Sequence, residues 1–218
     1  MTEATSSEMT WAERAAERSP VVQRSRTRGV EQATAIVHAA RRLVITKGPN
    51  FTTQELIKEA GIALQTFYRY FPGKDHLILA VIADLIDDAC VRFRAAAEGL
   101  PGPIERLRSY VDSVAQSLVH ADHGPRFITS EHWRLQALYP EDIALAIRPF
   151  TDMLLSEIRA GAELGLLHPA DTEYAAWIMT QLLLAVFHHY EAAGLAGPAE
   201  DVAERVWSFC FAALGGEA

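Results

Sequence analysis

The sequence predicts an all-α protein in which an N-terminal three-helix helix-turn-helix domain precedes a larger helical bundle. Three observations lead to this fold class. Apolar residues recur three and four positions apart over most of the chain, no segment alternates convincingly with a period of two, and breaks rich in Gly and Pro separate the helical patterns. Half of the 218 residues are apolar, which is enough to bury a core and excludes a largely disordered chain.

The charge of the chain changes sign along its length. Residues 14–74 contain eleven basic and four acidic side chains, a balance of +7, whereas residues 75–218 contain nine basic and twenty-one acidic ones, a balance of -12. A basic head on an acidic body is typical of a protein that holds nucleic acid at one end. The alternative is that these charges only solvate the surface.

Residues 1–27 are predicted to form a disordered arm, because they are polar and lack periodicity. Helical periodicity starts at Val30 and continues to the stop signal Gly48-Pro49. The arm carries three arginines that could enter a minor groove, although a solvated tail is the favoured interpretation. These are Arg24, Arg26 and Arg28.

A complete helix-start signal follows the first helix. Thr52-x-x-Glu55 is a capping box, and Phe51 before it can pack onto Leu56 as a hydrophobic staple. The second helix is therefore predicted to begin at the threonine pair and to end at Gly61. Together with a third short helix after this glycine, it makes a helix-turn-helix candidate over residues 28–74.

The third helix has two contrasting faces. Gln65, Tyr68 and Arg69 share one face, while Phe67 and Phe71 share the opposite one. We expect the aromatic face to anchor in the core. The other face offers an amide, a phenol and a guanidinium, which suit base edges and phosphates in a major groove.

Residues 75–218 are predicted to form the larger helical domain. Pro149 lies inside one of its helical patterns and should kink or divide that helix, since proline removes a hydrogen-bond donor and crowds the preceding turn. From the third helix onward the predicted ranges are about 63–71, 74–98, 103–121, 125–138, 140–167, 171–193 and 199–214.

The stretch FTTQELIKEAGIALQTFYRYFPGKDHLI closely resembles the DNA-binding motif of TetR-family transcriptional regulators, over about residues 36–82. That motif combines a T-T helix start, a Gly turn and a T-[LF]-Y-x-[YH]-F recognition helix. The resemblance implies a regulator, usually a repressor, of a double-stranded DNA operator. The DNA-contacting positions that it implies are Thr52, Thr53, Leu64, Gln65, Thr66, Tyr68, Arg69, Tyr70 and Lys74.

The resemblance also divides the roles within this set. The residues that open and line the recognition helix read bases, whereas the threonine pair, the two tyrosines and Lys74 bind phosphates. One departure is Ala63, where many family members have a serine cap. A missing cap costs about 1 kcal/mol, so we expect a recognition helix that is less ordered before DNA binds.

The last two helices carry more apolar surface than one neighbour can cover, which predicts pairing with a second copy of the chain. The resemblance to the family implies the same pairing, since family members dimerise through a four-helix bundle. A dimer would place two recognition helices about 34 Å apart, at successive major grooves of a palindromic operator. The predicted dimer residues are Trp177, Leu184, His188, Val202, Val206, Phe209 and Cys210.

Large apolar side chains on several body helices can line a cavity between them, although an ordinary packed core explains any one of them equally well. The resemblance implies that such a cavity holds an effector. When the effector binds, the two heads of the dimer no longer match the spacing of the DNA grooves. We expect a small lipophilic molecule. The predicted effector residues are Phe93, Tyr110, Val114, Leu118, Phe127, Trp133, Phe150, Leu154, Trp177 and Gln181.

Other classes of protein are disfavoured. No hydrolase, metalloprotease, Walker or dinucleotide motif occurs, and the histidines lack metal-ligand spacing, so we expect no enzyme, no metal and no cofactor. Cys90 and Cys210 lie in apolar helical patterns, and neither a signal peptide nor a membrane span is evident, which predicts a cytoplasmic protein with no membrane partner. A helical scaffold or binding module, whose basic head contacts protein, remains the alternative.

Overall fold

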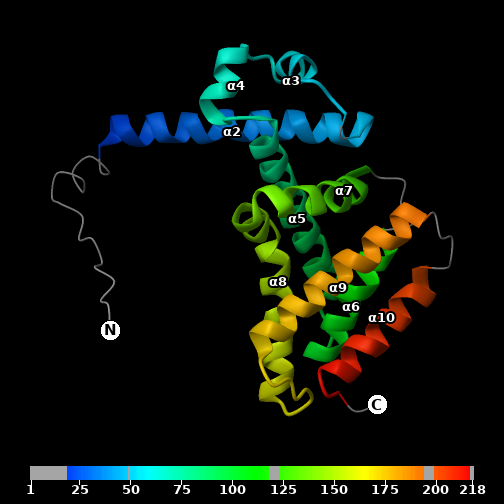
Figure 1. Cartoon of the computed structure of the whole chain (residues 1–218). Helices are drawn as coiled ribbons and strands as arrows, with labels where there is room; N and C mark the ends of the chain where they lie inside the picture. Colours follow the sequence, from blue (N-terminus) through cyan, green and yellow to red (C-terminus); the bar gives the residue numbers. More distant parts are fainter. Residues whose placement is uncertain (1–18, 49, 118–122, 194–198, 217–218) are drawn as a thin grey trace, which may run out of the picture.

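A computed structural model describes residues 19–48, 50–117, 123–193 and 199–216. All regular structure within these ranges is helical, which confirms the all-α prediction. The described residues form a small head of three helices and a body of six. Figure 1 shows how these two parts are arranged.

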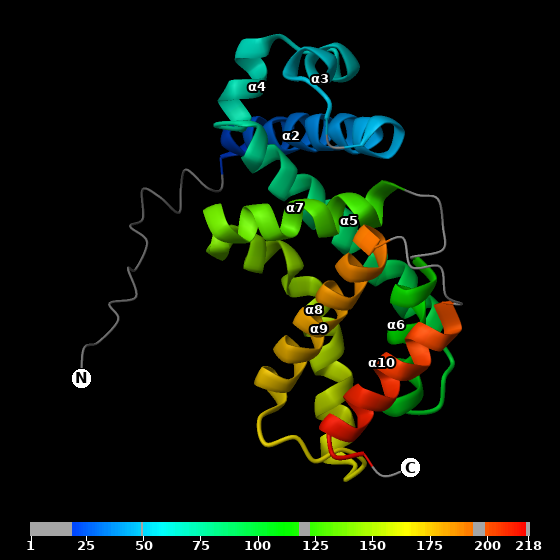
Figure 2. The ribbon, with the colours of Figure 1, turned by 45° about the vertical axis from the view of Figure 1, so that its right-hand side comes forward.

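The head consists of α2 (Pro20–Lys47), α3 (Thr53–Ala60) and α4 (Leu64–Tyr70). In Figures 1 and 2, α3 and α4 lie on the side of α2 that faces away from the body. Their apolar faces meet in a core that includes Ile36, Val44, Leu56 and Phe67, all essentially inaccessible to solvent. This core leaves the opposite face of α4 outside the protein.

The first helix is longer than predicted. It begins at Pro20, directly after Ser19, so the expectation of a disordered arm is wrong for residues 20–27, and residues 1–18 lie outside the described ranges. Proline at the first helical position favours this start, because the backbone N–H that it lacks would be unsatisfied there anyway. Periodicity could not reveal this segment, since residues 22–28 are all exposed and pack against no core.

The turn between α3 and α4 depends on one glycine. Gly61 has φ +64° and ψ +33°, a left-handed conformation, and its amide donates to the carbonyl oxygen of Lys58. A side chain is strained in this conformation, whereas glycine is not. The turn therefore fixes the angle at which α4 leaves α3.

The body consists of α5 (Lys74–Ala97), α6 (Pro103–Ser117), α7 (His123–Leu138), α8 (Pro140–Glu163), α9 (Thr172–Ala193) and α10 (Ala199–Ala213). In Figure 1, α5 runs from the head into the body, where it packs against α6, α7 and α8. α9 packs on α8 and α10 packs on α6, so α9 and α10 form one flank of the body, as Figure 2 shows. Pro149 lies within α8, which continues as a single helix instead of dividing there.

Candidate functional site

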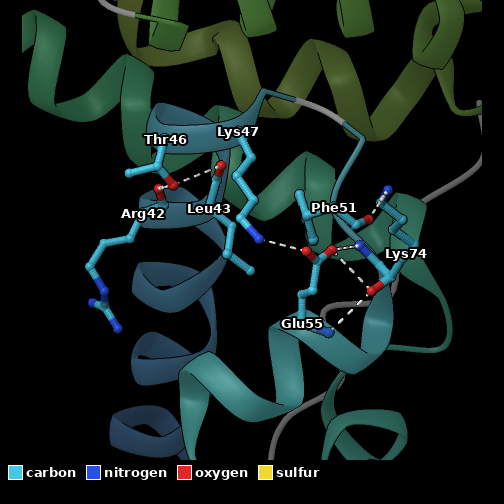
Figure 3. A network of polar contacts seen from close by, with 8 residues as sticks. Arg42, Leu43, Thr46, Lys47, Phe51, Glu55 and Lys74 are labelled. Atoms are coloured by element: carbon cyan, nitrogen blue, oxygen red, sulfur yellow. Dashed lines mark hydrogen bonds and ion pairs between the residues drawn. The ribbon is translucent and has the colours of Figure 1, made fainter.

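The N-terminus of α3 is held by a network of polar contacts, shown in Figure 3. The Glu55 amide donates to the Thr52 hydroxyl over 3.2 Å, and the Thr52 amide donates to the Glu55 carboxylate over 2.8 Å, which confirms the capping box. Lys47 donates to the same carboxylate over 2.6 Å. These bonds, the one from Lys47 above all, lower the pKa of Glu55 to about 2. The threonine pair is thereby held at the surface on a fixed helix end.

Lys74 also fixes this end of α3. Its ammonium group donates to the Phe51 carbonyl oxygen over 2.7 Å and lies 4.4 Å from the centroid of the Phe51 ring (Figure 3). Burial lowers the pKa of Lys74 below its usual value. The first residue of α5 thus holds the loop before α3. Its predicted contact with a phosphate stays a prediction.

The two faces of α4 separate as the sequence predicts. Phe67 and Phe71 are buried and stack with their ring centroids 6.0 Å apart. On the other side, Leu64 is 46% exposed and Tyr68 is 54% exposed, and Gln65 is also open to solvent. An exposed leucine and tyrosine on so short a helix leave apolar and polar groups available to a partner.

The rest of the predicted DNA-contacting set surrounds this face. Arg69 is exposed, and its guanidinium carbon lies 5.1 Å from the centroid of the half-buried Tyr70 ring. Thr66 is half-buried, and together with Gln65, Tyr68 and Arg69 it lines a shallow hollow. No side chain caps α4 at Ala63. All four side chains that line the hollow carry hydrogen-bonding groups.

A second hollow lies beside α4, and of its lining residues only Arg69 and Tyr70 belong to the predicted DNA-contacting set. This groove is lined by three arginines, one tyrosine, Ser25, Gly29 and Gln32, and it lies between the first half of α2 and the end of α4. Its charged side chains are Arg24, Arg28 and Arg69. The sequence showed the basic residues of the arm, but their position depends on α2 beginning early.

A partly open cavity of about 110 Å³ lies between the body helices, with its lining drawn from α2 and from α5 to α9. Of the predicted effector residues, Phe93, Val114 and Phe150 line it, and so does Leu184, which was assigned to the dimer. Periodicity did not single out the polar part of the lining, because these residues acquire their position only through packing of separate helices. The polar side chains are Arg41, Arg92, Ser117 and Thr129.

Most of the other predicted effector residues do not line this cavity. The Tyr110 hydroxyl donates to Glu157 over 3.4 Å, and Phe127 and Leu154 are buried in the core. Trp133 and Trp177 are exposed on the surface, and Gln181 is half-buried on α9. Leu118 lies outside the described residues. Helical periodicity identifies an inward face, but it does not distinguish filled core from cavity wall.

Arg41 connects the head with the cavity. It belongs to α2, yet it lines the cavity and donates to Asp84 of α5 over 2.8 Å, and it also pairs with Asp88. Within the body, a 2.7 Å ion pair with Arg134 of α7 holds Asp75 at the start of α5. Through Arg41, α2 of the head is therefore tied to α5 at the wall of the cavity.

The outer flank of α9 and α10 carries large exposed apolar side chains. Trp177 is 47% exposed and stacks on the exposed Tyr174, while Phe209 of α10 is 62% exposed. Two predicted dimer residues do not belong to this surface, because Val202 and Cys210 are buried inside their own chain, where α10 packs on α6.

The remaining predicted dimer residues are only partly accessible. Val206 is half-buried at a narrow space between α6, α9 and α10, and His188 is half-buried with its ring 6.2 Å from that of Trp133. Trp177 and Phe209 are therefore the predicted residues that a second copy can reach most directly.

The described part of the chain contains no group of three or more His, Cys, Asp or Glu side chains suited to a metal ion. None of its helices is long and apolar enough to cross a bilayer.

Comparison with known proteins places these features in a family. The family model of bacterial regulatory proteins of the TetR family matches residues 36–81, which run from α2 through α4 into α5. The HTH-type transcriptional regulator EthR of Mycolicibacterium smegmatis is 38% identical over 91 residues. That match spans 41% of this chain and 42% of the relative.

Solved structures share the fold over most of the chain. RolR in complex with resorcinol has a TM-score of 0.72 at 19% identity and covers 88% of this chain and 91% of its own. FadR of Thermus thermophilus, a TetR-family repressor in complex with lauroyl-CoA, has a TM-score of 0.69 at 18% identity and covers 84% and 94%. FadR of Bacillus subtilis in complex with stearoyl-CoA has a TM-score of 0.66 at 15% identity and covers 83% and 98%.

The head is a helix-turn-helix domain whose α4 faces outward, and the family model matches it over residues 36–81. That family consists of regulators rather than enzymes. Over residues 36–81, the chain belongs to the TetR family of bacterial regulatory proteins.

Proposed function

We propose that the protein is a sequence-specific DNA-binding transcriptional regulator of the cytoplasm, and that it represses its target genes until a small lipophilic effector releases it. The observation that carries this proposal is the division of α4, whose aromatic residues anchor in the core while Gln65, Tyr68 and Arg69 face solvent. A helix of this kind enters a major groove and presents its outer side chains to base edges.

The side chains at the start and on the outer face of α4 are placed to contact bases. Gln65 can hydrogen-bond an adenine with both ends of its amide, Leu64 can contact a thymine methyl group, and Arg69 can pair with guanine. Thr66 lies beside them in the same hollow. These groups at the start and along the outer face of α4 would determine sequence preference.

Phosphate contacts would surround these base contacts. Thr52 and Thr53 lie at the N-terminus of α3, where free amides and the helix dipole attract an anion. Tyr68 and Tyr70 can reach the backbone from α4. Lys74 supports the site by holding the Phe51 carbonyl, and its ammonium would add positive charge beside the phosphates.

A homodimer would present two such heads to a palindromic operator. The exposed Trp177 and Phe209, together with Tyr174, give the α9–α10 flank an apolar surface suited to a second copy of the same flank. Light scattering at micromolar concentration should therefore give the mass of a dimer. A monomer at that concentration would contradict the proposal.

The effector would occupy the cavity between α5 and the helices around it. Its volume of about 110 Å³ is well below the roughly 300–1,000 Å³ of sites that hold drug-sized ligands. It suits a single small ring, and a longer ligand would have to push α5 away from its neighbours. Resorcinol, the ligand of RolR, is a single small ring, whereas lauroyl-CoA, the ligand of Thermus thermophilus FadR, is much longer.

Release from DNA would follow from the position of Arg41. This residue lines the cavity and holds α5 through Asp84 and Asp88, so an effector that moves α5 also moves α2 and the recognition helix. Two heads of a dimer that no longer match the spacing of successive major grooves lose the operator.

A gel-shift experiment tests the proposed function. We expect the protein to shift duplexes selected from a random library, with affinity that falls steeply as salt rises. Gln65→Ala should relax the base preference by about 1–3 kcal/mol, whereas Gln136→Ala, a matched change of an exposed glutamine on α7, should not. A scaffold whose head contacts protein would retain no duplex at any salt concentration.

A further inference from the structure

We propose that the first half of α2 is a second DNA-binding element, in which Arg24 and Arg28 bind backbone phosphates that flank the bases read by α4. This inference rests on the proposed DNA-binding function and extends it. The occupant that we assign to the groove between α2 and α4 is the sugar-phosphate backbone of the same duplex.

The first half of α2 buries no core. Residues 22–28 are exposed, and buried apolar residues on α2 begin only at Ile36. In Figure 1 the N-terminal end of α2 extends past α4, away from α3 and the body. A helical stretch without an apolar face gains little from packing, so its sequence is free to serve contacts with a partner.

This stretch of α2 is strongly basic. Between Pro20 and Val30 the chain has three arginines and no acidic residue, although the whole protein has a net charge of -8. Arg24, Arg28 and Gln32 are spaced four residues apart, so they lie on the same face of the helix. That face forms one wall of the groove, and Arg69 and Tyr70 of α4 form the other.

The lining of the groove indicates the chemistry of its partner. The groove has three guanidinium groups and no carboxylate in its lining, which suits an anion. Arg69 lines both this groove and the hollow of Gln65, Thr66 and Tyr68 on the outer face of α4. The two surfaces are therefore continuous, and a strand whose bases meet α4 would continue with its phosphates along α2. A small anion would contact only one end of this continuous surface, whereas a nucleic-acid strand would contact all of it.

The size of the effect follows from counterion release. Each lost phosphate contact lowers the slope of log affinity against log salt by about 0.9, so a substitution present twice in a dimer lowers it by about 1.8. Over a fourfold change in salt, from about 50 to about 200 mM, the wild-type protein should lose roughly twelvefold more affinity than the variant.

The test compares three single variants of the full chain with equal changes of charge. Arg24→Gln and Arg28→Gln alter the groove, whereas Arg26→Gln alters the same exposed stretch without altering the groove lining. Operator affinity is measured at several salt concentrations, and circular dichroism checks that α2 keeps its helical content. We expect Arg24→Gln and Arg28→Gln to lower the salt slope, to weaken cognate and random duplexes alike and to shorten the hydroxyl-radical footprint at its edges.

Different outcomes overturn different claims. If the wild-type protein binds operator but the salt slopes of Arg24→Gln and Arg28→Gln equal those of the wild type or of Arg26→Gln, the groove is not a phosphate site and the proposed regulator stands. If the wild-type protein binds no duplex, the proposed function itself fails. A change of base preference in either groove variant would also contradict a contact with phosphate alone.

Discussion

Adding a cap to the recognition helix should stabilise it. Ala63 has φ −77° and ψ 151°, the extended conformation that N-cap residues adopt, but it offers no side-chain acceptor. In Ala63→Ser the new hydroxyl could accept from the amide of Gln65 or Thr66, and Ala63 is exposed, so the added oxygen meets open space. The backbone is already in the required conformation. The gain should therefore approach the usual value of a cap.

That gain is about 1 kcal/mol, within a range of roughly 0.5–2 kcal/mol. For a protein of this size it corresponds to a rise in melting temperature of about 2–4 °C. It should also slow hydrogen exchange of the α4 amides about fivefold if they exchange through local opening of α4. Calorimetry and exchange measured by mass spectrometry test the two readouts.

Ala63→Val is the matched control, because valine fills the same exposed position and cannot accept a hydrogen bond. The reasoning is refuted if serine and valine change the melting temperature equally. It is also refuted if serine leaves the exchange of α4 unchanged, since the N-terminus of α4 would then not be the weak point of the helix.

Three further predictions concern the head and the buried thiols. Glu55 has a pKa of about 2, below its usual value near 4.5, so it stabilises the fold above pH 4.5 and this contribution disappears as the pH falls towards 2. The difference in denaturation midpoint between wild type and Glu55→Gln should shrink over the same range, and a constant difference would contradict the ion pair with Lys47. Phe67→Ala should lower the free energy of unfolding in urea by about 3–5 kcal/mol, whereas Tyr68→Ala on the exposed face should change it by less than about 0.5 kcal/mol. Burial raises the pKa of Cys90 and Cys210 to about 11, so neither thiol should react with a disulfide reagent at pH 7.5 before denaturant is added, and fast labelling of the folded protein would show that these helices open.

The sequence was most informative where local rules determine the structure. The capping box at Thr52, the glycine turn at Gly61 and the two faces of α4 each depend on a few neighbouring residues, and all three are present in the structure. Helix ends in the body differ from the predicted ones by a few residues at most, because Pro and Gly mark them.

The parts that the sequence did not predict depend on residues far apart in the chain. Arg41 of α2 reaches the cavity only because α2 crosses α5, and no spacing in the sequence brings it next to Asp84. Val202 was assigned to the dimer and is buried instead, because an apolar stripe does not show which neighbour covers it. The early start of α2 was missed for the opposite reason, since an exposed helix without an apolar stripe leaves no periodic signal.

The most direct test of the account is to select duplexes with the wild-type protein from a random library and to repeat the selection with Gln65→Ala. We expect the wild type to enrich a palindrome whose half-sites are centred about one helical turn apart, or a multiple of it. Gln65→Ala should lose preference at one position in each half-site. Recovery of no enriched sequence by the wild type, or of the same sequence with the same preference by the variant, would contradict the claim that the outer face of α4 reads DNA.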